Sequence, residues 1–145
     1  MKTAQKKLSV GVLASGSGTD LQSIIDASEQ SMIEATVEVV ISDRNDAYAL
    51  SRSKKHGIPG FFVDPKGKDR AAHEDEIDMI LREHQVELLV GAGYMRLLSP
   101  SFVEKWHHKL INIHPALLPS FKGTNGQRDA LQYGVKISGC TTHFM

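Results

Sequence analysis

The sequence predicts an α/β protein: a doubly wound, mostly parallel sheet with helices on both faces. Short apolar runs, of the length of buried strands, alternate with segments in which apolar residues recur every three or four positions. The turn after the first apolar run contains Gly16 and Gly18, which is typical of a strand that passes directly into a helix. Regular alternation of strand and helix indicates βαβ units, which build parallel sheets covered on both sides.

Six strands are expected. Most are continuous apolar runs, as in sheets buried on both faces, whereas the last one alternates between apolar and polar residues. The expected strands are residues 8–14, 35–43, 60–64, 86–94, 109–114 and 137–145.

Five helices are expected between the strands. Leu21, Ile24 and Ile25 lie on one face of the first helix. Ser99 and Pro100 have the residue types preferred at a helix cap and first turn. The expected helices are residues 20–30, 47–57, 69–84, 99–106 and 126–134. In the third helix we interpret four acidic residues as solvated charge: Glu74, Asp75, Glu76 and Asp78.

Composition narrows the class of protein. The 145 residues are the size of one domain, and 17 basic residues balance 17 acidic ones, which argues against a nucleic-acid or charged membrane partner. No apolar run approaches the roughly 18 residues of a spanning helix, and the start lacks a signal-peptide core, so a cytoplasmic location is expected. Cys140 is the one cysteine, which excludes an internal disulfide; its place in the alternating strand predicts a small core residue.

The pattern is incomplete at the end of the chain. It stops on the sixth strand, and no helix follows, although both faces of a parallel sheet need cover. We therefore expect residues 1–145 to form a single domain that lacks its C-terminal part.

The first candidate site is the stretch ASGSGTDLQ, residues 14–22. Glycines allow close approach of the backbone, and a helix N-terminus attracts an anion. A P-loop is excluded because Ser17 and Gly18 stand where Lys and Ser/Thr belong, and Leu21 replaces the third glycine of a dinucleotide motif. A single phosphate fits this loop. The alternative is a tight turn in which Thr19 or Asp20 caps the helix.

The second candidate site is the stretch GAGYMRLLSP, residues 91–100, after the fourth strand. Its glycines also permit close approach, and Arg96 either binds a carboxylate or forms a structural ion pair. The side chains that would line an apolar slot for a flat ligand are Tyr94, Met95, Leu97 and Leu98.

The third candidate site is INIHP, at the end of the fifth strand. Asn112 and His114 alternate with two isoleucines and therefore point to one face of the sheet. Ligands of doubly wound sheets bind at the carboxyl ends of the strands. The residues are consistent either with catalysis or with polar side chains paired inside the protein.

The remaining histidines do not indicate a metal centre. His107 and His108 follow Trp106 in a connector and are expected at the surface. His73 begins the sequence HEDEI, which lacks the second histidine of the zinc-protease motif, and no cluster has metal-ligand spacing. His143, near the end of the last strand, is a candidate for supporting the third site.

Five stretches carry a resemblance to a known family: GVLASGSGTDLQSIIDA, VVISDR, AGYMRLLSP, INIHPALLPSFKG and GVKISGCTTHF. Together they resemble the phosphoribosylglycinamide formyltransferases over about residues 8–145. The resemblance implies a Rossmann-like formyltransferase fold. It also implies that a formyl group passes from 10-formyltetrahydrofolate, as co-substrate, to the amine of glycinamide ribonucleotide in purine biosynthesis, with small-molecule substrates and no metal.

The resemblance also implies roles for individual residues. The catalytic pair is Asn112 and His114. The ribonucleotide phosphate would bind Ser17, Gly18, Thr19 and Asp20. The folate would bind Arg70, Tyr94, Met95, Arg96, Leu97 and Leu98. The family has an aspartate that assists the catalytic histidine; at the family's spacing it falls past Met145, so reduced activity is expected of this 145-residue form.

Other readings remain open. The stretch HPALLPSFKG also resembles formyltetrahydrofolate deformylase, a hydrolase, although that family usually has a second histidine where Pro115 follows His114. A methionyl-tRNA formyltransferase should show a basic face, which the neutral composition does not support. A sugar-phosphate-binding module without catalytic activity is the alternative that is not an enzyme.

Overall fold

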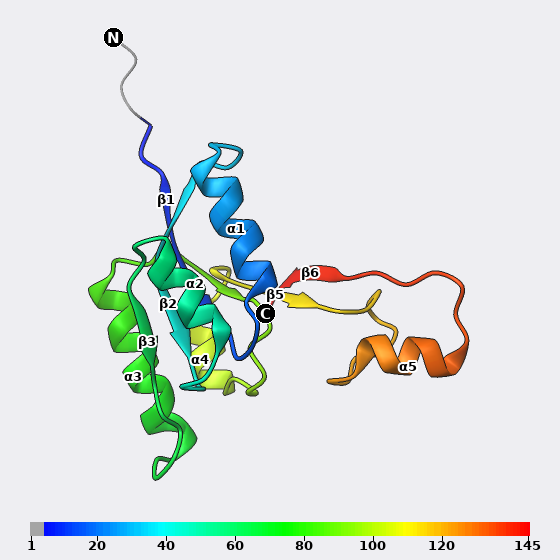
Figure 1. Ribbon diagram of the computed structural model, residues 1–145. Coiled ribbons are helices and arrows are strands. Elements are labelled where there is room, and N and C mark those ends of the chain that lie inside the picture. The colour runs from blue at the N-terminus through cyan, green and yellow to red at the C-terminus, as the bar shows by residue number, and fades with distance from the viewer. Residues whose placement is uncertain (1–4) are drawn as a thin grey trace.

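The computed structural model describes residues 5–145 and contains a six-stranded sheet with helices packed against it (Figure 1). The strands are β1 (Leu8–Leu13), β2 (Ala35–Ser42), β3 (Gly60–Phe62), β4 (Leu88–Gly91), β5 (Leu110–His114) and β6 (Thr141–Phe144). The helices are α1 (Thr19–Glu29), α2 (Tyr48–Lys55), α3 (Arg70–Glu83), α4 (Pro100–Lys105) and α5 (Gly126–Tyr133).

The sheet has the doubly wound order β3-β2-β1-β4-β5-β6. Strands β1 to β5 pair in parallel, and β6 pairs antiparallel with β5. The chain runs outward from β1 through β2 to β3 and then crosses back to β4 on the other side of β1. This reversal leaves a crevice between the carboxyl ends of β1 and β4, where such sheets bind their ligands. The predicted fold class is confirmed.

Two apolar clusters hold the layers together, one on each face of the sheet. On one face, Leu21 and Ile25 of α1 and Ala49 of α2 pack on Val12 and Val40. The cluster on the other face joins the sheet to α3 and α4. Its largest buried side chains are Leu13, Ile41, Ile77, Leu81, Leu89, Phe102, Trp106 and Leu110.

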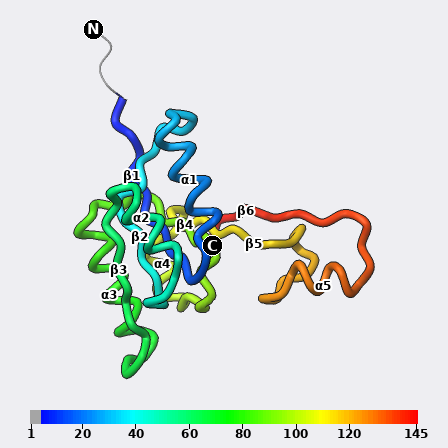
Figure 2. The backbone as a smooth tube through the Cα atoms, viewed as in Figure 1, coloured from blue at the N-terminus to red at the C-terminus, as the bar shows by residue number. Residues whose placement is uncertain are grey.

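The C-terminal part is packed less closely. In Figures 1 and 2, α5 lies apart from the other helices, beyond the ends of β5 and β6. No residue of β6 is buried, and Leu131 and Tyr133 on α5 are 81% and 80% exposed. Among residues 115–145, the buried positions are Ala116, Gly126 and Ala130. The expectation that a C-terminal part is missing stays a prediction.

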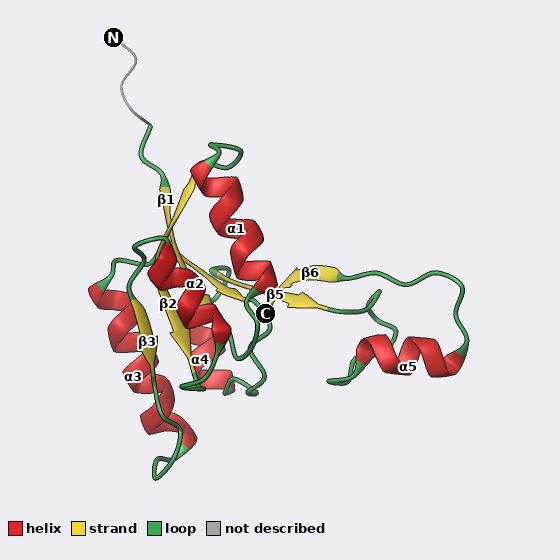
Figure 3. Cartoon of the chain, viewed as in Figure 1, coloured by secondary structure: helices red, strands yellow, loops and turns green. Residues whose placement is uncertain are grey.

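Three details of the sequence prediction are wrong. Residues 137–140 are not strand but part of the loop that leads from α5 to β6 (Figure 3). Cys140 is exposed and not a core residue, because this loop stands off the sheet. Glu74 is not solvated: it is 5% exposed and accepts hydrogen bonds from Ser99. Its partner lies 25 residues ahead in the sequence, so the acidic run alone could not reveal the contact.

Candidate active site

A cavity of about 960 Å³ opens at the carboxyl ends of β1, β4 and β5. It is lined by Ser17 and Asp20 from the loop after β1, by the segment 93–98 after β4, and by Asn112 and His114 at the end of β5. The three stretches singled out in the sequence therefore meet in one place. A smaller hollow of about 530 Å³ adjoins it and is also lined by Asn112 and His114.

The loop after β1 presents a helix N-terminus that has no side-chain cap. Gly18 is the N-cap of α1, in the left-handed conformation with φ 73°, and it has no side chain to accept a hydrogen bond. The alternative in which Thr19 or Asp20 caps the helix is therefore wrong. The loop is held from behind by Arg52 of α2, whose Nε donates to the carbonyl oxygen of Ser17 at 2.7 Å.

The two glycines of this loop have different surroundings. A Cβ at Gly18 would lie 2.8 Å from the Cα of Ala49, so Gly18 is there because α2 packs directly against it. A Cβ at Gly16 would meet nothing within 4 Å, and the φ of Gly16 is not positive. A side chain at Gly16 would therefore cause neither a clash nor backbone strain, a distinction that the spacing of glycines does not reveal.

The segment 93–98 forms a second wall of the cavity. Its backbone is fixed at Met95, whose N–H donates to Ser15 Oγ at 2.9 Å, and at Ser99, whose N–H donates to Glu74 Oε1 at 2.7 Å. The side chains between these anchors are open to solvent: Met95 is 67% and Leu97 75% exposed. The wall thus has an apolar surface on a backbone held by hydrogen bonds.

Two polar side chains on this wall differ in their environment. Tyr94 is half-buried, and burial, together with the negative charge of Asp43, raises the pKa of its phenol above the usual range. Arg96 is exposed and lines the cavity, and none of the ion pairs formed by residues 5–145 includes it. The structural ion pair considered for Arg96 is therefore not present among the described residues.

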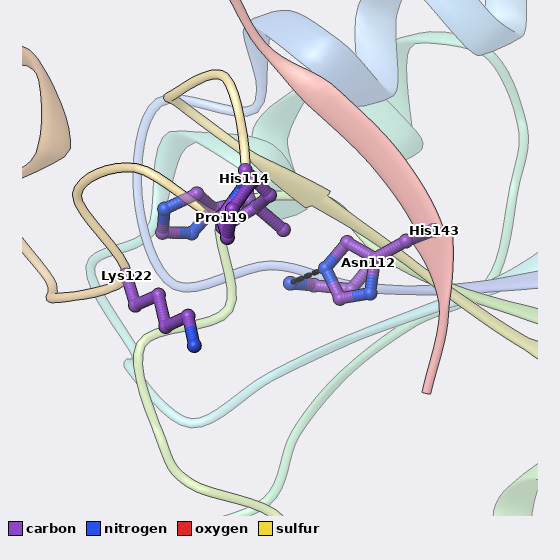
Figure 4. Close-up of a pocket in the computed structure, with 6 residues that line it drawn as sticks. Asn112, His114, Pro119, Lys122 and His143 are labelled. Atoms are coloured by element: carbon purple, nitrogen blue, oxygen red, sulfur yellow. Dashed lines mark hydrogen bonds between the residues drawn. The ribbon is translucent and has the colours of Figure 1, made fainter.

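Asn112 is positioned by both neighbouring strands. It lies opposite Gly91 of β4 and His143 of β6. The Asn112 Nδ2 group donates to His143 Nε2 at 3.4 Å (Figure 4). His143 Nδ1 lies 3.1 Å from the carbonyl oxygen of Phe144. A carbonyl oxygen only accepts, so the network assigns the His143 proton to Nδ1 and leaves Nε2 as the acceptor for the amide.

His114 is held by the loop that follows it. Its Nε2 lies 2.8 Å from the carbonyl oxygen of Phe121, so Nε2 carries the proton of the neutral ring and donates to that oxygen. Within residues 5–145, no hydrogen bond involves Nδ1, which is the basic nitrogen of this tautomer. Asn112 and His114 thus lie on one face of the strand, as predicted, and each has one hydrogen-bond partner that fixes its orientation.

Sequence reasoning gave no role to Lys122, which lines both hollows. Figure 4 shows Lys122 on the same side of the smaller pocket as His114, with Asn112 and His143 on the other side. Its signal in the sequence was its place within the stretch INIHPALLPSFKG, eight residues after β5 ends at His114. Other residues that line the cavity without having been predicted include Gln127, Ser138 and Cys140.

Not all predicted site residues reach the cavity. Gly18 and Thr19 are absent from its lining, although Ser17 and Asp20 on either side belong to it. Arg70 is exposed at the start of α3 and does not line the cavity either. Its predicted contact with the folate tail stays a prediction.

The other histidines lie outside this site. His107 and His108 are exposed, as predicted. His73 is buried and its Nε2 lies 2.9 Å from the carbonyl oxygen of Val63. In the described part of the chain, no three His, Cys, Asp or Glu side chains are grouped so that they could hold a metal ion. Likewise, none of the helices within residues 5–145 is long and apolar enough to cross a membrane.

The sequence and the fold are both similar to those of known proteins. The trifunctional purine biosynthetic protein adenosine-3 of Homo sapiens is 42% identical over 142 residues, which are 97% of this chain and 14% of that protein. The phosphoribosylglycinamide formyltransferase of Haemophilus influenzae is 40% identical over 137 residues, 94% of this chain and 65% of that protein. The chain thus spans less than two thirds of the length of each of these relatives.

A solved structure of a related protein has the same fold. The glycinamide ribonucleotide transformylase 1 of Symbiobacterium toebii superposes with a TM-score of 0.95 and 41% identity, covering 100% of this chain and 69% of that one. The family model described as formyl transferase matches residues 8–145, from the first residue of β1 to the end of the chain. The chain therefore belongs to the formyl transferase family.

Proposed function

We propose that this chain carries the catalytic pair of a transferase that moves a formyl group from 10-formyltetrahydrofolate to the primary amine of glycinamide ribonucleotide. The observation that carries the proposal is the meeting of three elements in one cavity: the loop after β1, the segment 93–98, and Asn112 with His114. Membership of the formyl transferase family supports the reaction class, and the name of the Haemophilus relative supports the acceptor of the formyl group.

The ribonucleotide phosphate would bind at the start of α1. The amides of the first helical turn have no side-chain cap, and a helix N-terminus carries partial positive charge. Gly16 and Ser17 offer further backbone next to these amides. The Asp20 carboxylate is a poor partner for a phosphate, so the contact at that residue would be made by its backbone N–H.

The folate would lie against the segment 93–98. Met95 and Leu97 present apolar side chains to a flat ring system, and Tyr94 adds an aromatic surface. Arg96, which forms no ion pair with the described residues, is suited to a carboxylate of the folate.

In the reaction, the amine nitrogen attacks the formyl carbon and forms a tetrahedral intermediate with a negatively charged oxygen. Asn112 has two amide hydrogens, of which one is donated to His143, so the other can stabilise that oxygen. His114 Nδ1 accepts the proton that the amine releases and passes it to the folate nitrogen as its bond to the formyl carbon breaks. The products are the formylated amine and tetrahydrofolate, with no net proton released.

A product assay tests the proposal. Purified chain is incubated with 10-formyltetrahydrofolate, with and without glycinamide ribonucleotide, while tetrahydrofolate is followed by absorbance and the ribonucleotide by mass spectrometry. A chain extended to the length of the Haemophilus relative is assayed in parallel, because the present residues span 65% of that protein. The proposal expects tetrahydrofolate and formylated ribonucleotide in equal amounts, and only when the ribonucleotide is present.

The alternatives give other products. A hydrolase would release formate and tetrahydrofolate without the ribonucleotide, and a binding module would bind the ribonucleotide without any tetrahydrofolate being formed by either chain. Pro115 directly after His114 is the feature that favours the transferase over the hydrolase.

A further inference from the structure

Ser15, the second residue after the end of β1, is a buried polar residue whose hydroxyl both donates and accepts a hydrogen bond. Its side chain is 2% exposed. The Ser15 hydroxyl donates to Asp43 Oδ1 at 2.7 Å and accepts from the Met95 N–H at 2.9 Å. Its own N–H donates to the carbonyl oxygen of Gly93 at 3.1 Å. Ser15 therefore contacts both ends of the turn from Gly93 to Met95.

These partners follow three neighbouring strands. Asp43 comes directly after β2, Ser15 follows β1, and Met95 follows β4, and in the sheet β1 lies between the other two. The gap between β1 and β4 is where the direction of the strand order reverses and where a ligand is expected. One buried hydroxyl thus ties together the backbone on both sides of that gap.

The segment 93–98 depends on such anchors. Tyr94 and Leu98 pack against the core, but Met95 and Leu97 are exposed and add no packing. Gly93 has φ 74°, which glycine adopts readily. Glu74 fixes the far end through Ser99, whereas the near end is fixed by Ser15. Because the Ser15 hydrogen is given to Asp43, the lone pairs of its oxygen are available to Met95.

We propose that Ser15 is a positioning residue: its hydroxyl, oriented by Asp43, orders the segment 93–98 before any ligand binds. Ser15 does not line the cavity. What the ordered segment binds rests on the function proposed above, but the ordering itself does not.

Amide hydrogen exchange of the free protein tests the ordering. Ser15→Ala removes both side-chain bonds, Asp43→Ala removes the group that orients the hydroxyl, and Asp43→Asn retains an acceptor. Ser53→Ala is the matched control, because Ser53 is also buried and its hydroxyl donates only to Leu50 of its own helix.

In Ser15→Ala and Asp43→Ala, the amides of residues 93–98 should exchange about tenfold faster, as expected for loss of one buried hydrogen bond. Exchange in β1, β2 and β4 should be unchanged. Asp43→Asn and Ser53→Ala should behave like the wild type.

A uniform acceleration across the sheet, or no change in residues 93–98, would overturn the inference. Ligand titration adds a second readout: Ser15→Ala should raise the Kd for 10-formyltetrahydrofolate about tenfold and that for glycinamide ribonucleotide less than twofold. Equal weakening of both ligands would contradict the positioning role. A wild-type protein that bound neither ligand would overturn the proposed function, and hydrogen exchange would still decide the role of Ser15.

Discussion

Gly91 and Asn112 lie opposite each other in the β4–β5 pair, and a Cβ at Gly91 would come within 2.9 Å of the amide oxygen of Asn112. The bare backbone of one strand therefore makes room for the amide of the next. Gly91→Ala should displace this amide and lower formyl-transfer turnover by about 100-fold, since small misplacements of a catalytic group are costly. Stability should fall by only about 1–3 kcal/mol, as for other overpacked sites. Steady-state kinetics and urea unfolding measure the two effects.

Gly11→Ala is the control for this substitution. Its Cβ would lie 2.8 Å from the end of the Leu81 side chain, in the core beneath the sheet and away from the cavity. The two alanines should cost similar stability, but only the one at Gly91 should abolish most of the turnover. Equal losses of turnover in the two variants would show that turnover does not depend on the exact position of the Asn112 amide.

Alanine at Asn112 or at His114 should lower turnover by about 100-fold or more, the usual contribution of an oxyanion donor or a proton-transfer group. Both side chains are only partly buried, so the folded structure and ribonucleotide binding should be retained. His108→Ala, at an exposed histidine, should have no effect. Near-normal turnover in both variants would show that Asn112 and His114 take no part in the reaction.

The affinity for the ribonucleotide should depend directly on Gly16, whereas a substitution at Gly18 should act through folding. Gly16→Ala adds a methyl group in open space without backbone strain, and should weaken ribonucleotide binding about tenfold or more while the melting temperature stays near that of the wild type. Gly18→Ala would strain a left-handed residue against α2, so its effect would report on folding. Calorimetric titration with glycinamide ribonucleotide measures the affinity, and Ser23→Ala on the same helix is the control. If Gly16→Ala bound the ribonucleotide with normal affinity, the phosphate would have to bind elsewhere.

The pKa of Tyr94 gives the protein a specific alkaline instability. Burial, and then the charge of Asp43, raises the pKa of its phenol above the usual value of about 10. The unfolded chain therefore releases this proton first, so the contribution to stability is complete below about pH 10 and falls as the pH rises further. Tyr94→Phe should make the decline in the free energy of unfolding above pH 10 less steep. The change in slope corresponds to the release of at most one proton on unfolding. Urea unfolding at several pH values measures this slope, and identical slopes would contradict the shifted pKa.

The fold, and the position of Asn112 and His114 at the ligand edge, could be predicted because their signals are local. Apolar runs and three-to-four spacing mark strands and helices, and the alternation of Asn112 and His114 places both on one face. The position of the strand end then identifies the ligand edge. The roles proposed for individual residues come from the resemblance to a known family, because spacing alone left them open.

Contacts between distant segments could not be predicted. Glu74 looks like one of several solvated acids, and only the packing of α3 beside Ser99 makes it a buried acceptor. The phosphate contact predicted for Gly18 stays a prediction, and only the position of α2 shows that this glycine also makes room for Ala49. Cys140 was misjudged for the same reason, since the loop that carries it stands off the sheet. The folate contact predicted for Arg70 stays a prediction.

The uneven packing of the molecule has a consequence for how it fails on heating. The sheet and helices α1 to α4 enclose two apolar clusters. Between residues 115 and 145, by contrast, only three residues are buried, all of them alanine or glycine. Such a segment opens at a lower free energy than the core. It contains Phe121, whose carbonyl oxygen holds His114, and Lys122, which lines both hollows. Opening it would dismantle the cavity while the core stays folded. Thermal inactivation should therefore precede calorimetric unfolding, and a protease should cut within residues 117–140 before it reaches the sheet.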